Sequence, residues 1–182
     1  MKKCIVVVLL SLLCMSLGFS QDLQAFQSSA RSFSIGTGLV ESGGDFGLQL
    51  NVATPWFAHG AVSVKAAGMM MYDASADWKT YWACKLGVVG GSFMSSANIR
   101  LYGEGGMLCV FPPAGNGTQE ILFGGYGHFG FEFFIGDSAW IPVYFMELGA
   151  GGVRPSIGGT GGERFMNGFS ATVGLRWVLH WR

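Results

Sequence analysis

Apolar residues alternate with small or polar ones along residues 168–181, which read Gly-Phe-Ser-Ala-Thr-Val-Gly-Leu-Arg-Trp-Val-Leu-His-Trp. The apolar positions of this segment are Phe169, Ala171, Val173, Leu175, Trp177, Leu179 and Trp181. Among the intervening positions, Val178 alone is neither small nor polar. Because successive side chains of an extended strand point to opposite faces, this alternation predicts a β-strand with one apolar and one polar face.

Seven further segments show a related pattern, separated by turn and loop residues. The eight predicted strands span residues 32–40, 46–54, 61–72, 80–89, 98–111, 121–134, 140–153 and 168–181. The run Ser42-Gly43-Gly44-Asp45 is a turn signal, and Pro55 ends a strand because proline has no N–H to donate to a β-ladder. The pattern predicts an all-β chain of successive antiparallel hairpins. The last strand is expected to pair with the first and remove the final open edge of the sheet.

Composition indicates where such strands would be stable. Only 12% of the residues are charged, about half the ~25% of an average soluble domain. After Gln21 no apolar run reaches the ~18–20 residues that a membrane-spanning helix needs. A chain that crosses a membrane without such a helix must do so as a closed barrel, because lipid offers no partner to open backbone groups. The predicted fold is therefore an eight-stranded antiparallel up-and-down transmembrane β-barrel.

The first twenty residues have the organisation of a secretory signal peptide. A positive start and an apolar stretch at residues 5–17 lead to small residues at Gly18 and Ser20, just before a cleavage site at Gln21. A lipoprotein cut before Cys14 is disfavoured, because the residues before it do not follow the lipobox pattern. Cleavage leaves nine of the eleven basic residues against eleven acidic ones, a balance that argues against a nucleic-acid surface. The predicted organisation is a cleaved signal peptide at 1–20 and one barrel domain at 21–182.

Volume predicts which face of the strands lies inside. An eight-stranded barrel has an interior just wide enough to be filled by side chains. The apolar faces, with many Phe, Trp, Leu and Val residues, would overfill this space, whereas the faces rich in Gly, Ser and Thr fit it. A soluble lipocalin-like barrel, with the apolar face inward, is therefore disfavoured. We expect the apolar faces to contact lipid.

Charged residues of the strands are assigned to the lumen, since an Arg or Lys facing lipid at the membrane midplane would cost ~2–4 kcal/mol. Arg100 and Glu104 share one face without adjustment, whereas three other strands are oriented by placing their single charge inward. Because buried charges are normally paired, we expect an ion-pair network that plugs the barrel. The predicted lumen network comprises Lys65, Lys85, Arg100, Glu104, His128, Glu132, Glu147 and Arg176.

Aromatic residues on the opposite face suit a membrane boundary, where ring bodies are apolar and Tyr or Trp tips stay wet. The predicted lipid-facing aromatic belt comprises Trp82, Phe129, Phe131, Phe133, Tyr144, Trp177 and Trp181. Four aromatic residues, Tyr81, Tyr126, Phe134 and Phe145, fall on the inward face, against this pattern.

Four stretches carry a resemblance to a known family. They are Leu-Tyr-Gly-Glu-Gly-Gly at 101–106, Phe-Gly-Phe-Glu-Phe-Phe at 129–134, Met-Glu-Leu-Gly-Ala-Gly-Gly at 146–152 and Leu-Arg-Trp-Val-Leu-His-Trp at 175–181. The chain resembles the small eight-stranded outer-membrane barrels of the OmpX/OmpW-like and OmpA-barrel group. The resemblance implies the outer membrane of a diderm bacterium, a periplasmic N-terminus and loops at the cell surface. Outer-membrane lipid, periplasmic chaperones and the barrel-assembly machinery are the implied partners.

These observations favour a monomeric, non-enzymatic barrel without metal or cofactor, and with a structural or surface-interaction role. An extracellular ligand is expected at the loops 112–120 and 154–167. The first alternative is a channel for small or hydrophobic solutes, as the OmpW resemblance implies. The second is a lipid A-modifying enzyme. Lipid A deacylases of this size share a His-x-Ser motif on one strand. The one similar stretch here, His128-Phe129-Gly130, has glycine in place of the serine and therefore lacks the nucleophilic hydroxyl. A catalytic site assembled from residues of several strands remains an alternative.

Two cysteines, Cys84 and Cys109, lie after the predicted cleavage site. Both are predicted to face outward on neighbouring strands. They are expected to act as small apolar residues rather than as a bridge, because disulfide geometry is strict.

Overall fold

The computed structural model describes residues 32–58, 61–74, 77–94, 98–112, 121–135, 142–154 and 165–179. Several expectations lie outside these residues: the signal peptide at 1–20, most of the loops 112–120 and 154–167, and Trp181. The described strands are β1 (Phe33–Ser42), β2 (Asp45–Ala53), β3 (Val62–Asp73), β4 (Lys79–Phe93), β5 (Ile99–Phe111), β6 (Leu122–Phe133), β7 (Val143–Val153) and β8 (Gly168–Leu179).

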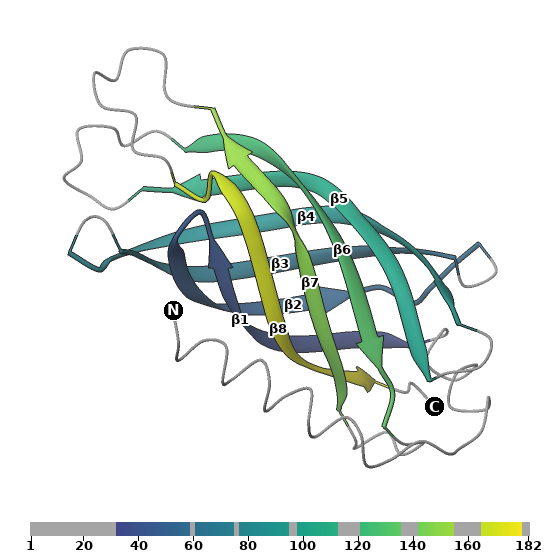
Figure 1. Ribbon diagram of the computed structural model, residues 1–182. Helices are drawn as coiled ribbons and strands as arrows, with labels where there is room; N and C mark the ends of the chain where they lie inside the picture. Colours follow the sequence, from purple (N-terminus) through teal and green to yellow (C-terminus); the bar gives the residue numbers. More distant parts are fainter. Residues whose placement is uncertain are drawn as a thin grey trace.

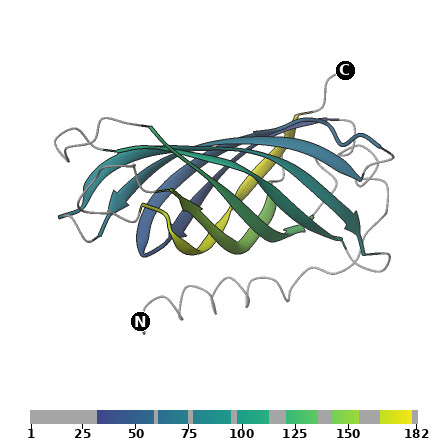
Figure 2. The same ribbon diagram turned by 90° about the horizontal axis from the view of Figure 1, so that it is seen from above.

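The eight strands form one closed barrel in which each strand pairs antiparallel with its neighbour in sequence, and β1 pairs with β8 (Figure 1). This confirms the predicted all-β, eight-stranded, up-and-down architecture. Strands of opposite walls cross at an angle in Figure 2, because closing a sheet into a barrel requires the strands to tilt. Within the described residues, the structure has no helix of the length and apolarity needed to span a membrane.

The predicted closure by the last strand is confirmed, with a register that runs from Phe33 opposite Leu179 to Ser42 opposite Ser170. The first turn is also as expected. Gly43 and Gly44 have φ values of 64° and 97°, and Ser42 pairs with Asp45. Two positive φ values in a two-residue loop are typical of the hairpin turn whose twist matches that of the flanking strands.

Strand boundaries differ most from the prediction at β4, which continues to Phe93 instead of ending at residue 89. Gly90 and Gly91 begin the stretch 90–97, which was expected to turn the chain with part of it open to extending the flanking strands, and they pair with Gly103 and Tyr102 of β5. Glycine is a frequent turn residue, but in a closed barrel the neighbouring strand supplies ladder partners that override this local preference.

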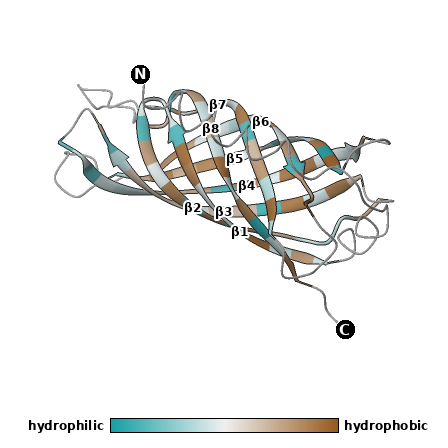
Figure 3. Ribbon diagram, turned by 60° about the horizontal axis from the view of Figure 1, so that its bottom comes forward, coloured by the Kyte–Doolittle hydropathy of each residue, from teal (hydrophilic) through white to brown (hydrophobic). Residues whose placement is uncertain are grey.

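Burial alternates along the strands as the sequence pattern predicts. The ribbon coloured by hydropathy shows hydrophobic and hydrophilic bands along the same strands (Figure 3). On β2, for example, Leu48 and Leu50 are exposed, whereas Gln49 and Asn51 are buried. Two charges on the described strands are not buried, Glu41 and Lys79, and both lie within two residues of a strand end. We call the end that carries the β1–β2, β3–β4, β5–β6 and β7–β8 connections the loop end, and the opposite one the terminal end. Both charges lie at the loop end.

The interior at the loop end holds a cluster of apolar side chains, which the sequence pattern did not predict. Its members include Val40, Met69, Met71, Tyr81, Leu108, Val110, Leu122, Val153, Phe165 and Met166. Phe165 and Met166 precede β8 in a segment that was predicted to be an exposed loop. For these two residues that prediction is wrong, because both side chains are buried in the barrel mouth and the Phe165 ring packs edge-on against Tyr81. Burial of two large apolar side chains in an apolar mouth stabilises this arrangement.

Candidate functional site

All eight residues predicted to line the lumen are buried inside the barrel. β3 carries Lys65, β4 carries Lys85, β5 carries Arg100 and Glu104, β6 carries His128 and Glu132, β7 carries Glu147 and β8 carries Arg176. The two-residue period of each strand places these side chains on the same face as its glycines and small polar residues. Six strands therefore converge on one charged interior.

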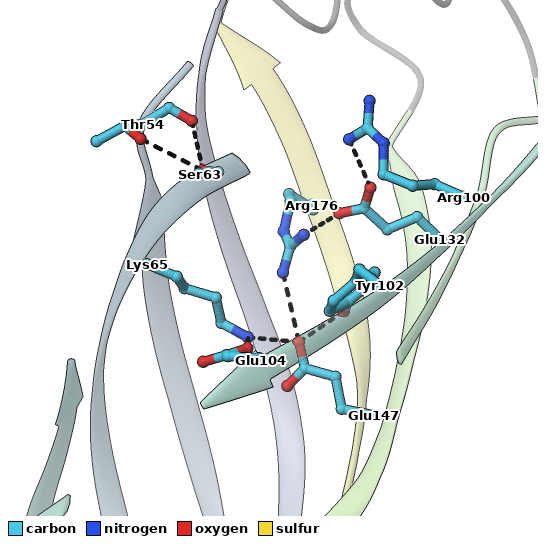
Figure 4. Close-up of polar contacts among 9 residues, drawn as sticks. All are labelled: Thr54, Ser63, Lys65, Arg100, Tyr102, Glu104, Glu132, Glu147 and Arg176. Atoms are coloured by element: carbon cyan, nitrogen blue, oxygen red, sulfur yellow. Dashed lines mark hydrogen bonds and ion pairs between the residues drawn. The ribbon is translucent and has the colours of Figure 1, made fainter. Parts of the chain in front are cut away.

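Six of the eight side chains form a continuous chain of ion pairs (Figure 4). The Lys65 Nζ donates to Glu104 Oε2 at 2.5 Å and also to Glu147 Oε1. Arg176 Nη2 lies 3.6 Å from Glu147 Oε1, and its Nη1 donates to Glu132. Arg100 Nη1 completes the chain with a bond of 2.9 Å to the other oxygen of Glu132. Three cations thus match three carboxylates, which is the condition for burying such charges.

Two tyrosines complete the hydrogen bonding of the carboxylates. The Tyr102 hydroxyl donates to Glu147 Oε1 at 2.7 Å, and the Tyr126 hydroxyl donates to Glu104 Oε1 at 2.6 Å. The sequence-based network omitted both residues. The sequence pattern could have identified Tyr102, because it shares its face with Arg100 and Glu104. A tyrosine that points inward needs a hydrogen-bond partner for its hydroxyl.

Glycine at position 130 makes room for one of these tyrosines. A Cβ at Gly130 would overlap the ring of Tyr102, whose hydroxyl reaches across to β7. The glycine-rich inward faces therefore do more than reduce volume: they create the space in which bulky polar side chains cross the interior.

A second polar contact lies at the loop end. Tyr81 donates from its hydroxyl to Asp45 Oδ2 at 2.6 Å, and the Ala74 backbone N–H donates to Asp45 Oδ1 at 3.3 Å. Asp45 belongs to the predicted turn at residues 42–45, and Tyr81 is one of the four inward aromatic residues that did not fit the outward pattern. This hydrogen bond connects the start of β2 to the start of β4 at the loop end of the barrel.

The terminal end of the interior is closed by aromatic contacts with a cation. The Arg100 guanidinium lies 4.3 Å from the centroid of the Trp56 ring and 5.4 Å from that of Phe134. Phe134, which did not fit the outward aromatic pattern, therefore has a defined contact. Such stacking stabilises a desolvated guanidinium.

Lys85 and His128 belong to the lumen set but not to the ion-pair chain. Within the part of the chain that the structure describes, Lys85 Nζ and both ring nitrogens of His128 have no hydrogen-bond partner. The Lys85 ammonium lies 5.1 Å from the centroid of the Tyr126 ring, a weaker contact than an ion pair. The lumen set has four bases and three carboxylates, and the three ion-paired bases match the three carboxylates, so Lys85 is the excess charge.

Replacing Lys85 with methionine is expected to raise the free energy of unfolding by about 1–3 kcal/mol, because a buried ammonium without a carboxylate is costly to desolvate. Equilibrium unfolding of the refolded barrel in urea measures this change. A loss of stability in Lys85→Met would contradict the assignment of Lys85 as the uncompensated charge.

Glu104, His128 and Glu147 each offer a ligand atom, and these atoms lie within 4.8 Å of one another. Two carboxylates and an imidazole form a donor set that divalent metals accept. However, Lys65 already bridges the two carboxylates, and the uncompensated Lys85 shares this interior. A divalent cation would have to displace the Lys65 ammonium and would add to a positive excess, so the charge balance disfavours a metal here.

A hydrolytic site assembled from several strands finds limited support. His128 pairs in register with Gly149, and Gly149 pairs with Ser170, so an imidazole and a hydroxyl share one row of the wall. Neither His128 nor the Ser170 hydroxyl has a hydrogen-bond partner among the described residues. The nucleophile and the base are thus not connected, although that bond is the basis of such catalysis.

The predicted aromatic belt lies on the outward face wherever the structure describes it. Trp82, Phe129 and Tyr144 are exposed, and Phe131, Phe133 and Trp177 are partly exposed. Phe129, Phe131 and Phe133 of β6 form a row, with ring centroids 4.9 Å apart between Phe129 and Phe131 and 6.2 Å between Phe131 and Phe133. The outward surface is therefore both apolar and rich in aromatic rings.

Comparison with protein-family models finds no match for this chain, and comparison with curated protein sequences finds none either.

Proposed function

We propose that the protein is an integral barrel of the outer membrane of a diderm bacterium, with a closed lumen and a structural or surface-interaction role. The observation that carries this proposal is the distribution of charge. On the described strands, the buried network holds the charges of the middle of the barrel, and Glu41 and Lys79 at the loop end are the two that are not buried.

The outward surface supports the same proposal. Large apolar side chains are exposed on seven of the eight strands, among them Ile35, Leu50, Leu86, Met107, Phe123, Leu148 and Phe169, and on β3 the outward Met70 is partly exposed. A soluble monomer rarely exposes a contiguous apolar patch of more than a few hundred Å². Lipid is the environment in which such a surface, wrapped around the whole wall, is stable.

The interior supports a closed barrel rather than an open pore. The ion-pair chain crosses the middle, the Arg100 contacts with Trp56 and Phe134 close the terminal end, and Phe165 with Met166 fills the loop end. A path for solute would require the separation of buried ion pairs, and this is costly. The proposed role therefore rests on the wall and its connections: a membrane anchor that assembles with periplasmic chaperones and the barrel-assembly machinery.

Refolded protein in planar lipid bilayers is expected to show no discrete channel openings, because a chain of buried ion pairs crosses the interior. Discrete openings that disappear in Glu104→Gln or Arg100→Met would overturn the closed lumen and favour the solute channel. Membrane fractionation and heat-dependent migration on a detergent gel test the location and the barrel itself. Identical migration of boiled and unboiled samples, with the protein in the soluble fraction, would contradict the membrane barrel.

A further inference from the structure

Cys84 and Cys109 face each other across β4 and β5. The register pairs Cys84 directly with Cys109, one of twelve consecutive residue pairs between these strands. Both side chains lie on the outward face, and both are half-buried. The sequence contains four cysteines, and the other two, Cys4 and Cys14, lie within the predicted signal peptide.

The geometry of this pair suits a covalent bond. Directly opposed residues of an antiparallel ladder have Cα atoms ~4.5–5.5 Å apart, and disulfides join Cα atoms ~4.4–6.8 Å apart. Because the two residues occupy the same row and the same face, their Cβ atoms point the same way. Rotation about the side-chain bonds is then enough to bring the two sulfur atoms together.

The surroundings argue against other uses of the thiols. The neighbouring outward pairs along the ladder are Trp82 with Phe111 and Leu86 with Met107, all of them apolar. A reactive thiolate needs a nearby cation or a helix N-terminus, and a thiolate metal site needs further ligands. Among the described residues, the one cluster with metal-binding potential is Glu104, His128 and Glu147, on the opposite face of the wall.

We propose that Cys84 and Cys109 form an intramolecular disulfide that joins β4 to β5. The proposal rests on the proposed function for its compartment, since disulfides persist outside the reducing cytosol. The oxidant is a protein or small-molecule disulfide of the periplasm. One cysteine thiolate attacks it and forms a mixed disulfide. The second thiolate then attacks the first cysteine's sulfur, so that both sulfur atoms of the oxidant leave as thiols, on one molecule for a protein disulfide and on two for a small-molecule disulfide. Two thiol protons are lost, and two electrons pass to the oxidant.

This bond has a structural consequence at the loop end of the barrel. Cys109 lies two residues before the end of β5, where the chain enters the connection to β6. A one-residue slip of β4 against β5 would exchange the outward and inward faces of one strand. A covalent link at this position excludes that slip and fixes β4 against β5 close to the point where β5 ends.

The thiol state of the protein isolated from membranes tests the proposal. The sample is denatured without reductant, treated with N-ethylmaleimide and weighed intact. We expect no maleimide on the untreated monomer and two after reduction. Two maleimides without reduction, or a disulfide-linked dimer, would overturn the proposal. The matched control is Cys84→Ser, which is expected to take one maleimide with or without reductant.

Oxidation in vitro separates this proposal from the proposed function. The reduced, refolded barrel is incubated with oxidised glutathione. We expect the wild type to lose both free thiols without gaining glutathione, and Cys84→Ser to gain one glutathione at Cys109. Glutathione adducts on the wild type would show that the pair cannot close. The disulfide could form in the refolded barrel while the protein is absent from the membrane fraction. In that case the proposed function fails, and the inference about the cysteine pair stands.

Discussion

Replacing Lys65 with methionine is expected to lower the free energy of unfolding by about 3–5 kcal/mol, because removal of one member of a buried ion pair leaves an uncompensated charge. Lys65 bridges Glu104 and Glu147, so its loss leaves two carboxylates in the interior without their shared cation. Unfolding of the refolded barrel in lipid vesicles, followed by tryptophan fluorescence in a urea series, measures the change.

The matched control for Lys65→Met is the same substitution at Lys85, which shares the interior but has no carboxylate within hydrogen-bonding distance among the described residues. The two variants remove the same charge from the same barrel and are expected to change stability in opposite directions. Adding Glu104→Gln to Lys65→Met is expected to restore part of the loss, because it removes one of the two orphaned charges. Equal effects of the two lysine variants would contradict the pairing shown by the structure.

Leu50→Arg is expected to destabilise the barrel in a bilayer by about 2–4 kcal/mol, the cost of a cation at the membrane midplane. Leu50 is 66% exposed and pairs with Thr37 and Gly68 near the middle of their strands. On a soluble barrel the same exposed position would tolerate arginine within about 0.5 kcal/mol. The substitution therefore separates the two environments, with the unfolding free energy in lipid vesicles as the readout.

Leu179→Arg is the depth control for this substitution. Leu179 is 53% exposed, faces outward like Leu50 and is the last residue of β8, at the terminal end. An arginine near the membrane surface costs only about 0–1 kcal/mol. A small effect at both positions would contradict a lipid-facing wall, whereas a large effect at Leu50 alone is the expected result.

Strand number, antiparallel order and the face of each strand could be predicted from the sequence, because the two-residue period is a local property of the chain. The assignments of Arg100, Glu104 and Arg176 to one interior depended only on counting positions along each strand. Strand boundaries were less predictable where the chain has glycines, because glycine is found both in turns and in strands, as at Gly90 and Gly91 of β4. The apolar cluster at the loop end could not be predicted from single strands. Met69 and Met71 share a face with polar residues of β3, and their apolar neighbours come from other strands.

The sequence by itself determined which side chains share a face, since that follows from alternation within single strands, and the positions of the charges together with the interior volume determined which face points inward. Only the tertiary structure decided which inward charges meet, because each pair joins different strands: Lys65 and Glu147 are 82 residues apart. The register and closure of the barrel set the distances between side chains of different strands. Among the described residues, Lys85 has no carboxylate within hydrogen-bonding distance, whereas Tyr102 and Tyr126 each donate a hydrogen bond to a carboxylate. They also place Cys84 opposite Cys109, a relation that alternation along either strand does not contain.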